Sequence, residues 1–191
     1  MMLRYPDPPL RDPATEISLR PWGARGDANA LATAWADPAI AANSVLPQDR
    51  TEDAARRWIA GEAARRQRGL ALDLVIEGPQ PGAVVGARVD DAPRVLLGEV
   101  GLARFDPSGR AEIGFWLTAM ARGRGIASTA VDLLSAWALN DAGLNRKRLW
   151  ARVRPENARA GRVLQRSGYA RIGDASGYVI WARDCADIVS L

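Results

Sequence analysis

The stretch MARGRGIAST, residues 120–129, is the part of this 191-residue chain whose residue types and spacing most clearly indicate chemistry. Two glycines and two arginines stand between an apolar run typical of a strand and another typical of a helix. Glycine lets the backbone approach a ligand closely. The start of a helix offers unpaired N–H groups and the positive end of the helix dipole. The stretch therefore predicts an anion site, most often one for phosphate.

Composition restricts the chemistry that such a site can perform. The chain has one cysteine, Cys185, and no histidine. This excludes an internal disulfide, Ser–His–Asp and Cys–His systems and nearly every zinc site, and we expect no metal. Proton transfer falls to carboxylates, tyrosines, the single lysine, the backbone or water.

Charge is divided unevenly along the chain. The net charge is −1 over residues 1–95 and +5 over residues 96–191, the half that holds the glycine turn. An excess of this size suits one polyanionic cofactor, although a nucleic-acid binder remains an alternative. No apolar run reaches the roughly 20 residues of a membrane helix, and the Pro-rich N-terminus does not resemble a secretory signal. We expect a cytoplasmic protein without membrane contact.

Two antiparallel strands must lead into the turn, and a buried helix must follow it. Residues 95–105 and 111–118 flank the hairpin sequence DPSGR, and apolar residues recur at helical spacing over 126–140. A strand at 147–155, a short helix capped by Asn157 and two closing strands come next. In the first half we expect strands at residues 16–22 and 70–77, with a hairpin extension at 83–89. Helices are expected within 26–40, with a stop at Pro38, and over 51–69, with Thr51 as the cap.

Three phosphate-binding patterns compete for the turn. The P-loop pattern is absent, and the dinucleotide pattern G-x-G-x-x-G ends at Ser128 instead of a glycine. The third pattern, [RQ]-x-x-G-x-[GA], is met by Arg122, Gly125 and Ala127.

With this setting, the sequence resembles the GNAT superfamily of N-acetyltransferases. The segments AEIGFWLTAMARGRGIAS and VRPENARAGRVLQRSGYARIG are most similar to its RimJ/RimL-type branch. The resemblance covers roughly residues 16–183. It implies a single α/β domain over 1–191, with residues 1–15 as an extension and 184–191 as a tail. Its sheet would be mixed, mostly antiparallel and twisted, of about six to seven strands flanked by helices.

The resemblance also implies the cofactor, acetyl-CoA or another acyl-CoA, and the residues that hold it. The pyrophosphate would lie on the turn and the helix start, the pantetheine arm along the end of the preceding strand, and Asn157 near the thiol. The implied binding residues are Leu117, Thr118, Arg122, Gly123, Arg124, Gly125, Ile126, Ala127, Ser128 and Asn157. Many family members carry a tyrosine as general acid seven residues after the asparagine, where this chain has Leu164. Tyr169 and Tyr178 are candidates only by residue type.

Amine attack on a thioester requires a base to remove a proton from the ammonium. Glu112 is the first candidate, because it shares a strand face with Gly114 and Trp116 and similar enzymes often carry a glutamate near this point. Glu99 on the partner strand is the second candidate. Either glutamate could instead be an ordinary surface residue.

The acceptor would be a primary amine of a peptide, protein N-terminus, amino acid or small molecule, attacked directly in a ternary complex. Trp35, Trp58 and Trp116, and also Trp22, could line its site, or could belong to the core. An antibiotic acceptor, a succinyl donor paired with Arg104 or Arg152, and a non-catalytic acyl-CoA-binding module remain alternatives. A homodimer is possible.

Overall fold

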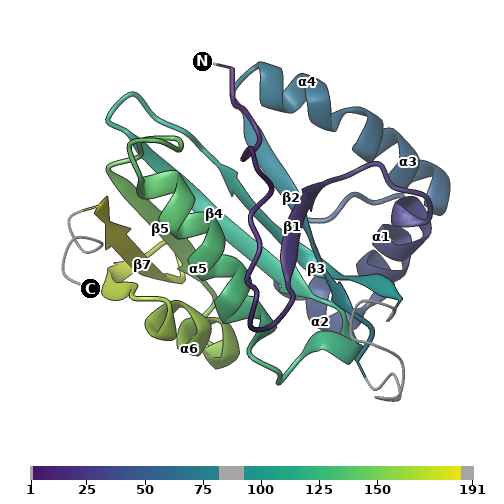
Figure 1. Cartoon of the computed structure of the whole chain (residues 1–191). Helices are drawn as coiled ribbons and strands as arrows, with labels where there is room; N and C mark the ends of the chain where they lie inside the picture. Colours follow the sequence, from purple (N-terminus) through teal and green to yellow (C-terminus); the bar gives the residue numbers. More distant parts are fainter. Residues whose placement is uncertain (1, 82–92, 186–191) are drawn as a thin grey trace.

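The computed structural model describes residues 2–81 and 93–185, and a seven-stranded sheet forms its centre (Figure 1). The strands lie in the order β1-β2-β3-β4-β5-β7-β6, and only β4 and β5 are parallel neighbours. This is the mixed, mostly antiparallel sheet that the family resemblance implies. The strands are β1 Ser18–Pro21, β2 Ala71–Pro79, β3 Arg94–Ala103, β4 Arg110–Leu117, β5 Arg148–Val153, β6 Ala170–Ala175 and β7 Tyr178–Asp184.

Helices cover both faces of the sheet. Within the described residues they are α1 Asp27–Ala36, α2 Pro38–Ala41, α3 Glu52–Ala60, α4 Glu62–Gln67, α5 Ile126–Leu139 and α6 Ala158–Arg166. The first helix stops before Pro38 as predicted, and Pro38 begins the short α2. The helix expected over 51–69 divides at Gly61. Thr51 caps α3 as predicted, its Oγ1 accepting the N–H of Ala54 at 3.2 Å. The hairpin extension expected at 83–89 lies outside the described residues.

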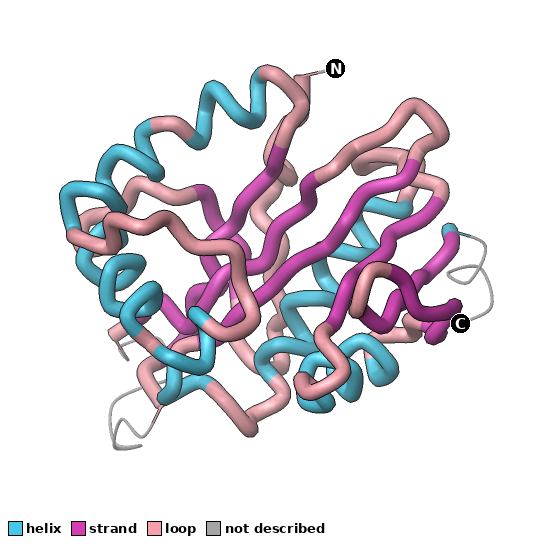
Figure 2. Tube along the Cα trace, turned by 180° about the vertical axis from the view of Figure 1, so that it is seen from behind, coloured by secondary structure: helices cyan, strands magenta, loops and turns pink. Residues whose placement is uncertain are grey.

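Alternation along the strands separates two apolar clusters. The larger one joins β1 to β5 with α5 and α6, and includes Leu102, Leu134 and Leu164. The smaller one, on the opposite face, joins Val75 of β2 to tryptophans on and near α1 and α3. Seen from behind (Figure 2), the strands form one continuous band across the molecule. Glu112, Gly114 and Trp116 alternate with the core residue Ile113, and therefore share the face of the smaller cluster.

The parallel pair β4 and β5 opens along its length. Arg110 to Glu112 pair with Arg148 to Trp150, and β4 then continues to Leu117 without pairing to β5. The main chain of β4 beyond Glu112 consequently borders an opening in the sheet. In the described part of the chain, no helix is long and apolar enough to cross a membrane.

Candidate active site

The turn before α5 is built to expose backbone N–H groups. Gly123 and Gly125 have φ of 75° and 79°, a region that side-chain-bearing residues rarely adopt. A Cβ at either glycine would meet nothing within 4 Å. Gly125 is also the N-cap of α5 and offers no side-chain cap. The first N–H groups of a 14-residue helix are therefore left without a cap beside open space, which is the arrangement that binds anions.

A cavity of about 650 Å³ joins this turn to the opening between β4 and β5. Phe115, Trp116 and Leu117 border it on β4, and Asn157 borders it at the start of α6. Four arginines and no carboxylate stand among the described residues that line the cavity. The cavity is thus cationic, and it extends from the helix N-terminus to the unpaired edge of a strand.

Most of the expected cofactor residues come together around this cavity. Those that line it are Leu117, Arg122, Gly123, Gly125, Ile126, Ala127, Ser128 and Asn157. Thr118 and Arg124 are outside the lining. The Thr118 N–H donates to the Leu97 carbonyl at 2.9 Å and its own carbonyl accepts from Ala121, so both main-chain groups are engaged. Arg124 is exposed, and its Nε donates to the carbonyl of Met120 at 3.2 Å.

Arg122 links the turn to the segment between α1 and α2. Its Nε donates to the carbonyl of Leu117 at 3.2 Å, and its guanidinium forms an ion pair with Asp37, the N-cap of α2. Burial opposes ionisation of Asp37, but the N–H of Ala39 and the Arg122 guanidinium outweigh it and lower the pKa of that carboxyl. Sequence reasoning missed Asp37, because its partner Arg122 is 85 residues away and no local sequence pattern indicates that the two residues meet.

Asn157 and Leu164 occupy the two ends of one helix. The Asn157 Oδ1 accepts the N–H of Ala160 at 3.2 Å, so the predicted cap is confirmed. Leu164 is buried in the larger core cluster. Tyr169 is also buried and shares a 2.7 Å hydrogen bond with Ser135, and its burial raises the pKa of the phenol. Tyr178 is half-buried, with the guanidinium of Arg152 5.3 Å from its ring.

The two candidate bases have contrasting surroundings. Glu112 lies where β4 and β5 part, and both its oxygens are held by guanidinium groups: Arg152 Nε at 2.9 Å and Arg104 Nε at 2.7 Å. Glu99 lies directly across β3–β4 from Trp116, whose Nε1 donates to it at 3.2 Å. No ion pair holds Glu99 within the described residues. Burial, with the neighbouring negative charge of Asp73, raises the pKa of Glu99 to about 8.

Asp73 is a second carboxylate that sequence reasoning missed. It lies one row from Glu99 on the same sheet face, over Gly101, where a Cβ would come within 2.8 Å of its Oδ1. Burial raises the pKa of Asp73 to about 6, although Arg65 stands 3.5 Å away and opposes the shift. Arg65 in turn lies 4.2 Å over the ring of Trp58. Asp73 therefore already has a cation beside it, the guanidinium of Arg65.

The expected acceptor tryptophans separate into two groups. Trp116 lines the cavity. Trp35 is buried and Trp58 packs edge-on against both Trp35 and Trp22, with ring centroids 6.4 and 5.7 Å away. The Trp22 indole is 8% exposed, its Nε1 makes no hydrogen bond in the described structure, and its N–H favours the ionised form of Glu99. Trp22 therefore joins Trp116 in the surroundings of Glu99.

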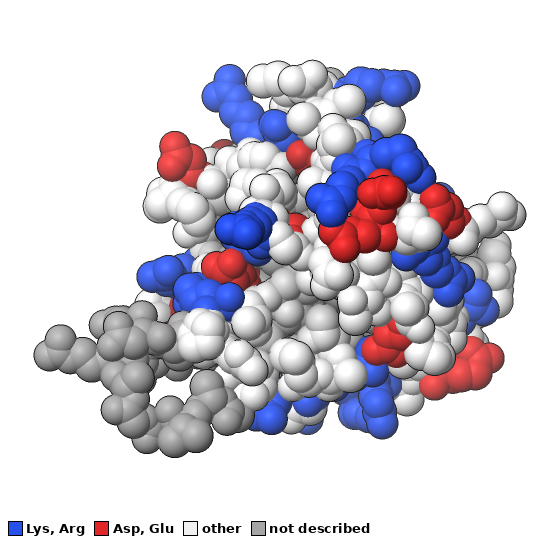
Figure 3. Space-filling model, turned by 90° about the vertical axis from the view of Figure 1, so that its right-hand side faces the viewer, with Lys and Arg blue, Asp and Glu red and all other residues white. Residues whose placement is uncertain are grey.

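Other features of the described residues give no competing site. No cluster of three or more acidic, cysteine or histidine residues arranged to hold a metal occurs among them. On the side of the molecule shown in Figure 3, acidic and basic side chains are interspersed and do not form one basic patch.

Comparison with known proteins agrees with this geometry. The acetyltransferase (GNAT) domain family matches residues 16–170. Among proteins of curated function, none matches the chain at significant similarity. RimJ of Mycobacterium smegmatis, solved in complex with CoA-disulfide, is 21% identical with a TM-score of 0.71, covering 94% of this chain and 87% of its own.

Two further solved structures share the fold. The ribosomal-protein-S5-alanine acetyltransferase of Vibrio fischeri is 18% identical, with a TM-score of 0.70 and 90% and 94% of the two chains covered. The spermidine N-acetyltransferase of Vibrio cholerae, in complex with CoA and spermine, is 16% identical, with a TM-score of 0.68 and 91% and 98% covered. Because the family match spans most of the chain, the protein belongs to the GNAT acetyltransferase family and is an N-acetyltransferase.

Proposed function

We propose that this N-acetyltransferase takes an acetyl group from acetyl-CoA and transfers it to a primary amine by direct attack, without an acyl-enzyme. The observation that carries the proposal is the single cavity that joins the uncapped start of α5 to the open edge of β4. The turn and first residues of α5 would bind the pyrophosphate, with Arg122 and Arg124 beside them. Leu117 and Asn157 would flank the pantetheine arm.

We propose Glu99 as the base, in place of Glu112. Accepting a proton would cost Glu112 its ion pairs with Arg104 and Arg152, whereas no ion pair holds Glu99 among the described residues, and Arg65 acts on it only from a distance. Glu99 also stands opposite Trp116, next to the cavity-lining end of β4. Glu112 lies about 16 Å along the strand from Leu117, at roughly 3.3 Å per residue.

Proton transfer from the acceptor then depends on the protein's own residues. The acceptor arrives as an ammonium ion, and its charge favours the ionised form of Glu99, which takes one proton from it. When bound, acetyl-CoA supplies a thioester carbonyl, at which the C–N bond forms and the C–S bond breaks. Leu164 is in the core, Tyr169 is bonded to Ser135, and Tyr178 is not among the residues that line the cavity. Water therefore takes the second proton of the attacking nitrogen and delivers a proton to the departing thiolate.

The charges around Glu99 favour one class of acceptor. Asp73 and Glu112 are each paired with arginine, which leaves one carboxylate for one ammonium. Trp22 and Trp116 add apolar surface beside it. A peptide or protein N-terminus, an amino acid or a small monoamine suits this arrangement better than a polyamine. A succinyl donor finds no support, because Arg104 and Arg152 are both engaged by Glu112.

The remaining proposals concern the branch of the family, the cellular location and the oligomeric state. We place the protein in the RimJ/RimL-type branch and in the cytoplasm. The outer strand β6, exposed along its length, is the sheet edge at which a homodimer would form.

The test is release of free CoA from acetyl-CoA in the presence of a panel of peptide and small-molecule amines. Wild type should turn over at least one acceptor, and Glu99→Gln should lower kcat by about 100- to 10,000-fold. Glu112→Gln is the matched control and should retain kcat within a few-fold of wild type. The reverse ranking would return the base role to Glu112. Binding of acetyl-CoA without turnover of any amine would identify a non-catalytic binding module.

A further inference from the structure

Three arginines on α6 point to a second anion subsite in the cavity. Arg159, Arg162 and Arg166 are spaced three and four residues apart, so they lie along one face of the helix. All three are exposed and line the cavity together with the glycine turn. None of them makes an ion pair or hydrogen bond within the described residues. Their row therefore presents positive charge to the cavity without an internal partner.

This charge exceeds what the turn itself requires. The uncapped N–H groups of α5 and Arg124 already provide donors for one pyrophosphate. Arg122 is neutralised by Asp37. No carboxylate lines the cavity among the described residues, and the adjoining hollow of about 570 Å³, which Arg159 and Arg162 also border, contains one acidic residue, Glu156. Three guanidinium groups without a partner in the described part of the chain remain, enough for a further phosphate.

The row of arginines also ends at the correct end of the cavity. The Ser167 Oγ, just after α6, donates to the Ser128 carbonyl in the first turn of α5 at 3.5 Å. The C-terminal end of α6 is therefore beside the start of α5, while Asn157 is at its other end. The arginine row therefore runs along α6 away from the opening between β4 and β5, and its Arg166 end lies next to the proposed pyrophosphate site.

We propose that Arg159, Arg162 and Arg166 bind the 3′-phosphate of the CoA donor. This inference rests on the proposed function and deepens it. A phosphate monoester carries a charge of about −1.5 to −2 at neutral pH and offers three acceptor oxygens. The planar fork of arginine matches those oxygens better than any other cation. The enzyme then prefers the complete 3′-phosphorylated nucleotide and discriminates against acyl groups carried on the phosphopantetheine arm of a carrier protein.

The experiment compares acetyl-CoA with acetyl-3′-dephospho-CoA, which differ only in this phosphate, by calorimetric titration. Wild type should bind acetyl-CoA about tenfold or more tightly than the dephospho compound. The combined variant Arg159→Gln, Arg162→Gln, Arg166→Gln should bind the two equally, at the wild-type affinity for the dephospho compound. The combined variant Arg4→Gln, Arg25→Gln, Arg68→Gln removes the same three charges at exposed positions outside the cavity lining, and as the charge-matched control it should keep the full discrimination.

Each outcome separates the two proposals. Equal binding of the two compounds by wild type overturns the 3′-phosphate subsite and leaves the acetyltransferase proposal intact. A triple variant that weakens both compounds by the same factor also overturns it, because the arginines would then serve the part of the donor that both share. If wild type binds neither compound, it is the use of acetyl-CoA that fails.

Discussion

Glu99 and Glu112 share one sheet face, but their neighbours give them different chemical properties. Glu112 is held between two guanidinium groups, whereas Glu99 accepts the indole N–H of Trp116 and lies beside the carboxylate of Asp73. A carboxylate among apolar rings and beside another negative charge retains its proton more strongly. The same surroundings that make Glu99 a useful base near neutral pH therefore disfavour its charged form in the folded protein.

The pKa of Glu99 predicts opposite pH trends for activity and stability. The base must be deprotonated, so kcat/KM should rise with pH and level off above about pH 8. In the unfolded chain the same group has a pKa near 4.3, so between about pH 4.3 and 8 the folded state holds the extra proton and its stability falls as pH rises. Urea unfolding at pH 5 and pH 9 should show wild type losing at least about 1 kcal/mol relative to Glu99→Gln. Parallel behaviour of the two proteins would contradict the raised pKa.

At the scale of elements, two glycines on β3 and β4 differ in the free space beside their backbone. A Cβ at Gly98 would come within 2.2 Å of the Trp116 carbonyl, so this position admits no side chain without moving the strand. A Cβ at Gly114 would meet nothing within 4 Å, and the residue is exposed on the face that carries Glu99 and Trp116. Gly114 therefore forms an open floor beside the proposed base, where the acceptor can lie.

Filling this floor should affect the acceptor and little else. We expect Gly114→Val to keep or slightly raise the free energy of unfolding, because valine favours a strand and has space there. The KM for the acceptor amine should rise several-fold, whereas the KM for acetyl-CoA should stay unchanged. Gly98→Ala is the contrasting variant and should destabilise the protein by about 1–3 kcal/mol, because the strand must shift. An unchanged acceptor KM in Gly114→Val would mean that the acceptor binds elsewhere.

The elements themselves were largely predictable from local patterns. Alternation, caps and turn residues indicated each strand and the helices α5 and α6, and Thr51 and Asn157 cap where expected. The division at Gly61 escaped prediction, because the helical pattern continues through it. The spacing of Arg159, Arg162 and Arg166 was visible in the sequence, but only the fold shows that they face the turn.

The surroundings of the carboxylates were not predictable, for a physical reason. Arg152 lies 40 residues from Glu112, and Arg122 lies 85 residues from Asp37. Such pairs depend on which strands and helices become neighbours, and neither hydrophobic periodicity nor capping encodes them. The choice between two glutamates as base therefore had to wait for the fold, whereas the glycine turn did not.

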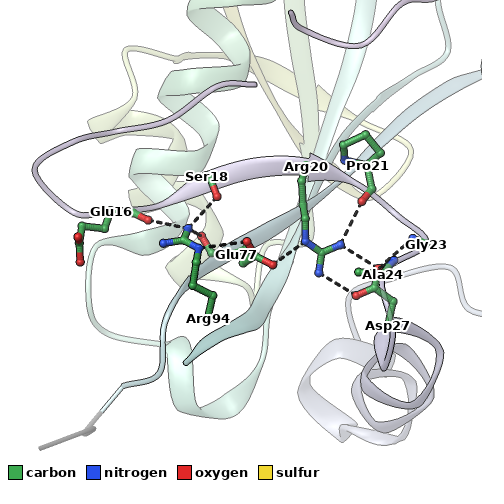
Figure 4. A network of polar contacts seen from close by, with 9 residues as sticks. All are labelled: Glu16, Ser18, Arg20, Pro21, Gly23, Ala24, Asp27, Glu77 and Arg94. Carbon is green, nitrogen blue, oxygen red and sulfur yellow. Dashed lines mark hydrogen bonds and ion pairs between the residues drawn. The ribbon is translucent and has the colours of Figure 1, made fainter. Parts of the chain in front are cut away.

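At the scale of the whole molecule, one polar network ties the start of α1 to the edge of the sheet (Figure 4). Asp27 is 3% exposed, and its carboxylate accepts hydrogen bonds from the N–H groups of Gly23 and Ala24 and from both terminal nitrogens of Arg20. Arg20 also reaches Glu77 on β2 at 2.6 Å, and Glu77 accepts from Arg94 on β3 at 3.1 Å. Because α1 contributes Leu31 and Trp35 to the smaller cluster and leads into Asp37, the network positions the helices beside the proposed acceptor site.

This network should make the fold sensitive to acid. Burial opposes ionisation of Asp27 and Glu77, but their arginine partners, joined at Asp27 by two backbone N–H groups, outweigh it and lower the pKa of each carboxyl. Their stabilising contribution is therefore complete above the unfolded pKa values, about 3.9 and 4.3, and is lost as pH falls through the lower folded values. Asp27→Asn should cost about 2–4 kcal/mol at pH 7, because it leaves Arg20 with a buried partner that carries no charge. Urea unfolding between pH 7 and pH 2.5 should show this gap narrowing as wild type loses the same interaction.

Asp174→Asn, which removes an exposed pair with Arg171, should change stability by less than about 1 kcal/mol throughout. A gap between Asp27→Asn and wild type that stays constant down to pH 2.5 would show that the network contributes packing and hydrogen bonds, and that its charge stabilises nothing.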